Sequence, residues 1–201
     1  MVSPAFGDDE QHDVAEFFVE MLRSMAAREV AQQRCVHGAP DAVSSALPLS
    51  VTYVEHVFGW VLERRRRCAV CGGCSAPVFE SGTVLTLPLP ADGSTAAVTP
   101  TELYMRFCGP VVLDGAAAVR CERCGVFTKH VEQQRIRRSP KVLAVHFQRA
   151  PGVPGLQSVR RAVDLEFEIV WPHLPSLELH SVVYHRGFDA TKGQYLSLIH
   201  I

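Results

Sequence analysis

The sequence has no long hydrophobic run. No stretch of its 201 residues approaches the ~18 consecutive apolar residues of a membrane span, and runs such as Val57–Leu62 are far too short. Near its start, Asp8, Asp9 and Glu10 stand where a secretory signal peptide would need a basic segment and an apolar stretch. We therefore expect a soluble protein of the cytosol or nucleus with no membrane partner.

An excess of charge of one sign is also missing. The chain has 20 Lys and Arg residues against 21 Asp and Glu residues, which gives a net charge of −1. A nucleic-acid-binding domain normally has a basic excess, so we expect no nucleic-acid partner. The run of four arginines at Arg64–Arg67 is the local exception, and on a strand it is typical of a solvated face.

The chain lacks the even number of cysteines that a disulfide framework would use, since it has seven. Four of the seven form two Cys-x-x-Cys pairs, which in a chain without a secretion signal favour a metal site. Four thiolates satisfy a tetrahedral zinc ion and leave no open position, so the ion would be structural. The alternative is that the thiols are free and buried. The predicted ligands of one zinc ion are Cys68, Cys71, Cys121 and Cys124.

The hydrophobic pattern predicts a long helix followed by short strands. From Val14 to about Arg34 apolar residues recur at helical spacing, with Asp8 or Asp9 as the expected cap. A second helix is expected at 101–107. The remaining apolar runs are bounded by Gly and Pro, so the expected class is α+β. The expected strands are 51–62, 83–89, 126–136, 142–148, 162–170 and 180–185.

Three segments in order resemble the ubiquitin-specific proteases, a family of cysteine deubiquitinases. Residues 11–18 (QHDVAEFF) resemble the family's Gln-Gln-Asp box, and residues 140–149 (PKVLAVHFQR) resemble its Pro-x-x-Leu strand. Residues 177–187 followed by Gly193-Gln194-Tyr195 resemble its C-terminal box, which ends in Gly-His-Tyr. The cysteine pairs lie between the first and second boxes, as they do in that family.

The resemblance implies a papain-like hand that holds ubiquitin, here truncated. It assigns residues 1–60 to a partial thumb, 61–135 to zinc-tipped, mostly antiparallel fingers and 136–201 to the palm. The fingers of the family hold the body of ubiquitin, and its tail runs between thumb and palm to a Cys–His–Asp/Asn triad. The residues implied to bind the ubiquitin tail are Gln11, Asp13, Glu16, His185, Gly187, Gly193 and Tyr195.

The catalytic residues of the family are missing from this sequence. The nucleophile would lie in a Gly-x-x-Cys-(Tyr/Phe)-x-Asn stretch upstream of Gln11, and none of the ten residues there is cysteine. Gln194 stands at the position of the general base, and an amide has no titration near neutral pH. We expect the third triad residue to lie beyond residue 201, so the chain is expected to be an inactive fragment of a catalytic domain.

Three hypotheses follow. In the first, the complete protein hydrolyses ubiquitin conjugates after the C-terminal glycine of ubiquitin. In the second, the protein is a pseudoprotease that binds ubiquitin without turnover. In the third, it is a zinc scaffold for another partner, which only Arg64–Arg67 favours. The alternation of residues 196–201 predicts a palm strand. The alternative is that an adapter used in sequencing libraries encodes this hexapeptide, beside which Gln194 lies.

Overall fold

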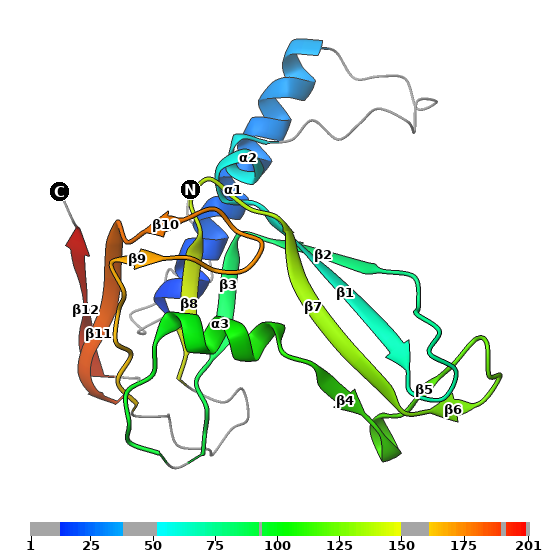
Figure 1. Cartoon of the computed structure of the whole chain (residues 1–201). Coiled ribbons are helices and arrows are strands. Elements are labelled where there is room, and N and C mark those ends of the chain that lie inside the picture. Colours follow the sequence, from blue (N-terminus) through cyan, green and yellow to red (C-terminus); the bar gives the residue numbers. More distant parts are fainter. Residues whose placement is uncertain (1–12, 38–51, 93, 150–160, 190–191, 200–201) are drawn as a thin grey trace.

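The computed structural model describes residues 13–37, 52–92, 94–149, 161–189 and 192–199. Two long features project from a shared core, one a helix and the other an extended sheet (Figure 1). The expected α+β class is confirmed, because an N-terminal helix precedes sheets that are mostly antiparallel. No helix of the described residues is long and apolar enough to cross a membrane.

The first helix, α1, spans Val14–His37 and begins where Asp13 caps it. The Asp13 carboxylate accepts the backbone N–H of Ala15 at 2.6 Å and that of Glu16 at 3.3 Å. Asp8 and Asp9, the expected caps, lie outside the described residues. The helix starts later than their position requires, because Asp13 supplies the side-chain acceptor one residue before its first turn.

A short helix, α2 (Tyr53–Phe58), stands where the sequence pattern predicted the first half of a strand over 51–62. That prediction was wrong. Thr52 and Glu55 form a capping box, in which the Glu55 amide donates to the Thr52 hydroxyl and the Thr52 amide donates to the Glu55 carboxylate. Such a pair satisfies two backbone donors of the first turn, which favours a helix over an extended chain.

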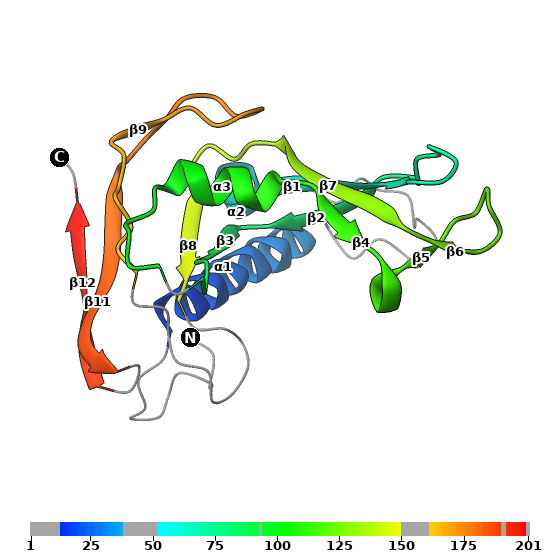
Figure 2. The same ribbon diagram turned by 60° about the horizontal axis from the view of Figure 1, so that its bottom comes forward.

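The projecting sheet has four antiparallel strands in the order β2-β1-β7-β4. Its two long central strands, β1 and β7, pair from Leu62↔Ile136 to Cys68↔His130. Both views show this sheet extending away from the core toward the small β5–β6 hairpin (Figures 1 and 2). This part of the chain contains one 3₁₀ helix, η2 (Gly115–Ala117), and the strands β1 (Trp60–Cys68), β2 (Val78–Gly82), β4 (Val111–Leu113), β5 (Val119–Arg120), β6 (Phe127–Thr128) and β7 (His130–Arg138).

The core lies where the base of this sheet meets α3 (Pro100–Cys108) and the parallel pair β3 (Val84–Pro88) and β8 (Ala144–Gln148). Tyr104 of α3 stacks on Trp171 with ring centroids 4.2 Å apart and planes 5° apart. The helix expected at 101–107 and the strands expected at 83–89 and 142–148 are confirmed. The buried apolar side chains of this core are Trp60, Leu62, Leu85, Leu87, Leu89, Val98, Leu103, Tyr104, Ile136 and Trp171.

The last part of the chain forms two hairpin-like pairs. The short strands β9 (Glu168–Ile169) and β10 (Leu177–Glu178) pair with each other, and β11 (Ser181–Asp189) pairs with β12 (Lys192–Ile199). The prediction of a strand over 162–170 was largely wrong, because only an isolated bridge at Val163 and the two residues of β9 pair with another strand there. Both views place the β11–β12 hairpin at the opposite end of the molecule from the β5–β6 hairpin (Figures 1 and 2).

Candidate functional site

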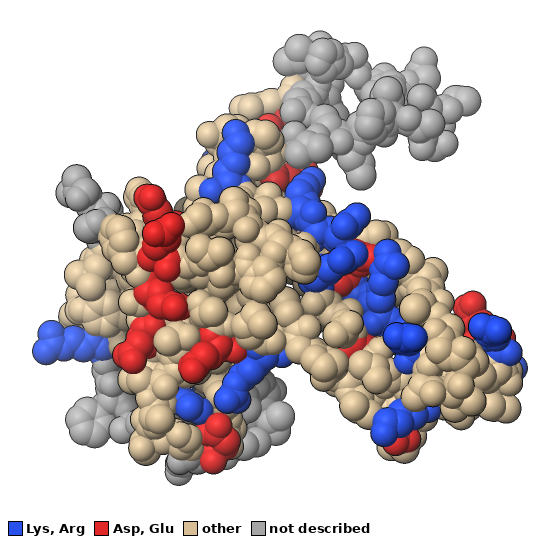
Figure 3. Space-filling view, in the orientation of Figure 1, with Lys and Arg blue, Asp and Glu red and all other residues tan. Residues whose placement is uncertain are grey.

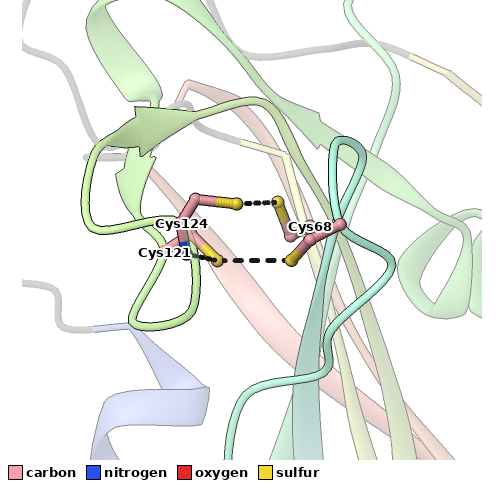
Figure 4. A group of neighbouring side chains, drawn as sticks. Cys68, Cys121 and Cys124 are labelled. Carbon is pink, nitrogen blue, oxygen red and sulfur yellow. Dashed lines mark hydrogen bonds between the residues drawn. The ribbon is translucent and has the colours of Figure 1, made fainter.

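Four cysteines meet at the end of the projecting sheet that lies far from the core. Cys68 ends β1 and Cys71 follows it in a turn, while Cys121 and Cys124 belong to the turn that joins β5 to β6. All four Sγ atoms lie within 4.8 Å of one another and could hold a metal ion. The side chains converge from two separate turns (Figure 4). The four ligands predicted from the spacing are therefore brought together.

The distances between the sulfur atoms fit a tetrahedral ion. Cys68 Sγ lies 3.9 Å from Cys124 Sγ, and Cys71 Sγ lies 3.7 Å from Cys121 Sγ. A tetrahedron with Zn–S bonds of about 2.3 Å has edges of about 3.8 Å. The sulfur cluster thus has the size that a Zn²⁺ ion requires.

Each cysteine pair is followed by a glycine that closes its turn. Gly72 and Gly125 have φ values of +68° and +74°, in the left-handed region that a side chain disfavours. Their amides donate to the carbonyls of Cys68 and Cys121 at 3.0 and 2.9 Å. The Cys124 amide also donates to Cys121 Sγ at 3.4 Å. A Cys-x-x-Cys-Gly spacing was the sequence signal that could have predicted these turns.

The pKa values of two thiols in the cluster shift in opposite directions. The Thr128 hydroxyl, followed by the backbone of Cys71, lowers the pKa of Cys68 to about 5. The neighbouring Cys71 thiol, burial and the other sulfurs raise the pKa of Cys124 to about 12. Several thiolates can share so small a volume only if a cation offsets their mutual repulsion.

The two other cysteines whose side chains the structure describes take no part in this cluster. Cys74 is exposed nearby, and Cys108 is half-buried in α3 beside Tyr104. The side chain of Cys35 lies outside the described residues. Within the described part of the chain, no other group of His, Cys, Asp or Glu has metal-binding geometry.

A second candidate site lies where α1 begins, next to the β11–β12 hairpin. His185 and Tyr195 face each other across the hairpin with ring centroids 5.0 Å apart. Burial raises the pKa of Tyr195, and the negative charges of Asp13 and Glu16 add to this effect, while the Val14 backbone opposes it. Four of the residues that the resemblance implied for tail binding are therefore neighbours.

The remaining residues of that set are placed less closely. Gly187 and Gly193 are partners in the hairpin ladder, and Gln11 lies outside the described residues. Gln194 pairs with Arg186, one residue from the His185–Tyr195 pair. Because side chains alternate along a strand, Gln194 points away from the face that carries Tyr195.

The fold resembles that of a solved deubiquitinating module. The structure titled "Structure of the SAGA Ubp8/Sgf11/Sus1/Sgf73 DUB module bound to ubiquitin aldehyde" superposes on 96% of this chain and 42% of its own, with a TM-score of 0.70 at 17% identity. That similarity confirms the expected thumb–fingers–palm architecture, in which the four-cysteine cluster lies at the end of the projecting sheet.

The sequence matches the ubiquitin carboxyl-terminal hydrolase family over residues 1–200. The chain belongs to that family. Ubiquitin carboxyl-terminal hydrolase 23 of Arabidopsis thaliana is 27% identical over 98% of this chain and 22% of its own length. Ubiquitin carboxyl-terminal hydrolase 12 of Salmo salar is 23% identical over 94% of this chain and 55% of its own. The chain thus spans between about a fifth and about half of the length of these relatives.

Proposed function

We propose that this chain is the ubiquitin-binding part of a deubiquitinase domain. The proposal rests on one observation: the first turn of α1 lies next to the β11–β12 hairpin. There the negative charges of Asp13 and Glu16 help to raise the pKa of Tyr195. A tyrosine beside carboxylates offers a hydroxyl and acidic acceptors to the backbone amides and basic side chains of an extended peptide. The similar deubiquitinating module was solved with ubiquitin aldehyde bound, which supports the ubiquitin tail as the extended peptide.

The cysteine cluster holds one structural zinc ion in this proposal. Its four protein ligands leave no position for a substrate, so the ion fixes the end of the projecting sheet and takes no part in hydrolysis. We assign residues 1–60 to the thumb, 61–135 to the fingers and 136–201 to the palm, and the protein to the cytosol or nucleus. A reducing compartment is the one in which four thiolates remain available to a metal.

In the complete protein, the proposed reaction is thiol-dependent hydrolysis after the C-terminal glycine of ubiquitin. A thiolate would attack the carbonyl, and an imidazole would activate the thiol and protonate the leaving amine. The 201 residues contain no cysteine in the family's nucleophile stretch, and Gln194 stands where the imidazole would be. We therefore propose that these 201 residues bind ubiquitin and do not themselves hydrolyse its conjugates.

The second candidate is a pseudoprotease whose function is ubiquitin binding alone. Gln194 favours it, because a glutamine amide donates and accepts hydrogen bonds but exchanges no proton near neutral pH. The codon for residue 194 in genomic DNA separates the two candidates. Histidine there, with the nucleophile stretch in the same reading frame, supports the enzyme, and a glutamine codon supports the pseudoprotease.

Calorimetric titration of the zinc-loaded chain with ubiquitin tests the proposal common to both candidates. We expect saturable binding of one ubiquitin per chain, weakened at least about tenfold when the C-terminal Gly-Gly of ubiquitin is removed. Equal affinity for intact and shortened ubiquitin would refute a tail site, and absence of binding would refute the proposed function as a whole.

A further inference from the structure

The two faces of β1 carry arginines in different charge environments. On the face shared with Leu62, Arg64 Nη2 lies 2.9 Å from Glu80 Oε2, and Arg66 Nε lies 2.6 Å from Glu132 Oε2. Two arginines therefore meet two carboxylates, and this face is close to neutral. We call it the balanced face.

The opposite face of the same strands has one carboxylate for four arginines. Along β1, Glu63 and Arg65 alternate with the residues of the balanced face. Arg135 and Arg137 of β7 lie on the same side of the sheet as Glu63. Arg67 follows Arg65 on this face and has no acidic partner among the described residues. We call the four arginines, Arg65, Arg67, Arg135 and Arg137, the arginine face.

Glu63 holds three of these guanidinium groups in place. Its side chain is 1% exposed, and it pairs with Arg65 Nε, with Arg135 Nη2 at 3.0 Å and with Arg137 Nε at 3.2 Å. Burial opposes ionisation of Glu63, but the hydrogen bonds from Arg65 and Arg135 hold its pKa below the usual value. Glu63 is thus a buried anion that orients the arginines above it.

Most hydrogen-bond donors of the arginine face remain available to a ligand. Each guanidinium has five N–H donors, and Arg65 and Arg137 each approach Glu63 through Nε. The side chains of Arg65, Arg135 and Arg137 stay 53%, 43% and 56% exposed. Because Glu63 already orders them, a ligand that binds there meets a smaller loss of side-chain entropy.

We propose that the arginine face binds an extended, acidic segment of a partner protein. Alternate residues of a strand are about 7 Å apart, so alternate carboxylates of an extended peptide match the spacing of Arg65 and Arg67. A guanidinium binds a carboxylate through two parallel hydrogen bonds. Phe79, the cross-strand neighbour of Glu63, is exposed on the same face and offers an apolar contact to the intervening side chains.

The charge of the whole chain favours a peptide over a nucleic acid as the occupant. Space-filling representation shows Lys and Arg gathered over the β1 and β7 part of the molecule and Asp and Glu over the part that carries β9 and β10 (Figure 3). With a net charge of −1, the remainder of the chain would repel a long polyanion that extended beyond the arginine face. A short acidic segment contacts only the local excess of positive charge on the arginine face.

Fluorescence anisotropy with the full, zinc-loaded chain tests this proposal. The probe is a fluorescein-labelled peptide of alternating Glu and Thr, measured at physiological ionic strength. We expect the double substitution R135Q/R137Q to weaken its binding about tenfold. The matched control is R64Q/R66Q, which removes the same charge from the balanced face and should change the affinity less than about twofold.

A second variant keeps the test valid if R135Q/R137Q does not fold. Arg67→Gln leaves the Glu63 cluster intact and should weaken peptide binding about threefold. Equal loss of affinity in R64Q/R66Q and R135Q/R137Q would overturn the proposal, because only net charge would then matter. Tighter binding of an oligothymidylate of equal charge, or displacement of the peptide by excess ubiquitin, would assign the surface to another ligand and would also overturn it.

Discussion

The two candidate sites of this chain differ in what their chemistry requires and what the sequence supplies. The cysteine cluster brings four sulfur atoms within 4.8 Å of one another, which is the number of ligands that a structural zinc ion requires. The site at α1 and the β11–β12 hairpin has the neighbouring acids and aromatic rings of a peptide site, but Gln194 stands where a titrating group would be needed. The proposed function therefore assigns binding and shape to this chain and proton transfer to residues that its sequence does not contain.

Removing one ligand of the zinc site should have the largest effect. Cys121→Ser leaves three thiols, and we expect bound zinc to fall from one ion per chain to near zero. Structural zinc contributes roughly 10–16 kcal/mol, as much as a whole domain's net stability, so the β5–β6 hairpin should lose its order. Metal analysis by mass spectrometry and hydrogen exchange of residues 119–131 measure the two effects.

Cys74→Ser is the control for that substitution, because Cys74 is an exposed thiol near the cluster that is not one of the four converging sulfurs. It should keep one zinc ion and the exchange protection of the hairpin. Retention of zinc by Cys121→Ser would contradict the assigned ligand set.

The tail site should respond most strongly at Tyr195. Tyr195→Ala removes the ring that contacts His185 and lies near Asp13 and Glu16, so we expect ubiquitin affinity to fall at least about tenfold. Zinc content should not change, which would separate the two sites. Calorimetry measures the affinity.

Tyr53→Ala on α2 serves as the control, since that tyrosine is already 67% exposed and lies on a different element. It should bind ubiquitin as the unmodified chain does. An equal loss of affinity in both variants would mean that Tyr195 does not mark a specific site.

The four converging sulfur atoms were predictable from cysteine spacing, whereas the surroundings of other buried groups were not. Two Cys-x-x-Cys pairs identify the four sulfurs, because ligand geometry leaves little choice of residue type. The buried Glu63 was not predictable from its own segment. It is stabilised by Arg135 and Arg137, which lie more than seventy residues away and reach it only because β1 pairs with β7.

The two errors in predicted secondary structure have different causes. Apolar runs such as 51–62 suit a strand and a buried short helix equally well, and local capping decided between them. The Thr52 and Glu55 box was visible in the sequence, as was the Thr99 and Glu102 box that begins α3. The loop around 162–170 depends instead on tertiary contacts, such as the Thr101 hydroxyl donating to Glu166 at 2.6 Å.

A smaller effect distinguishes two roles of Asp13. As the cap of α1, its loss in Asp13→Ala should cost about 1 kcal/mol of the free energy of unfolding. Asp13→Ser keeps a capping oxygen but removes the charge near Tyr195. We therefore expect Asp13→Ser to preserve stability, measured by urea denaturation, and to weaken ubiquitin binding, measured by calorimetry. If both variants bind ubiquitin as tightly as the unmodified chain, Asp13 is only a helix cap.

Restoring an imidazole should produce the smallest effect. Gln194→His supplies a titrating group on the β12 strand, but the 201 residues still contain no nucleophile stretch. We expect no release of fluorophore from a ubiquitin C-terminal amide substrate, as with the unmodified chain. Turnover by this variant would show that one of the seven cysteines acts as a nucleophile. It would contradict the proposal that this chain binds ubiquitin but contains no catalytic nucleophile.

Native mass spectrometry of the chain mixed with ubiquitin that carries a C-terminal electrophile tests the central claim most directly. The account predicts one species that contains the chain, one zinc ion and one ubiquitin, and that separates completely into its components under denaturing conditions. A covalent adduct that survives denaturation, or a chain that binds neither zinc nor ubiquitin, would contradict it.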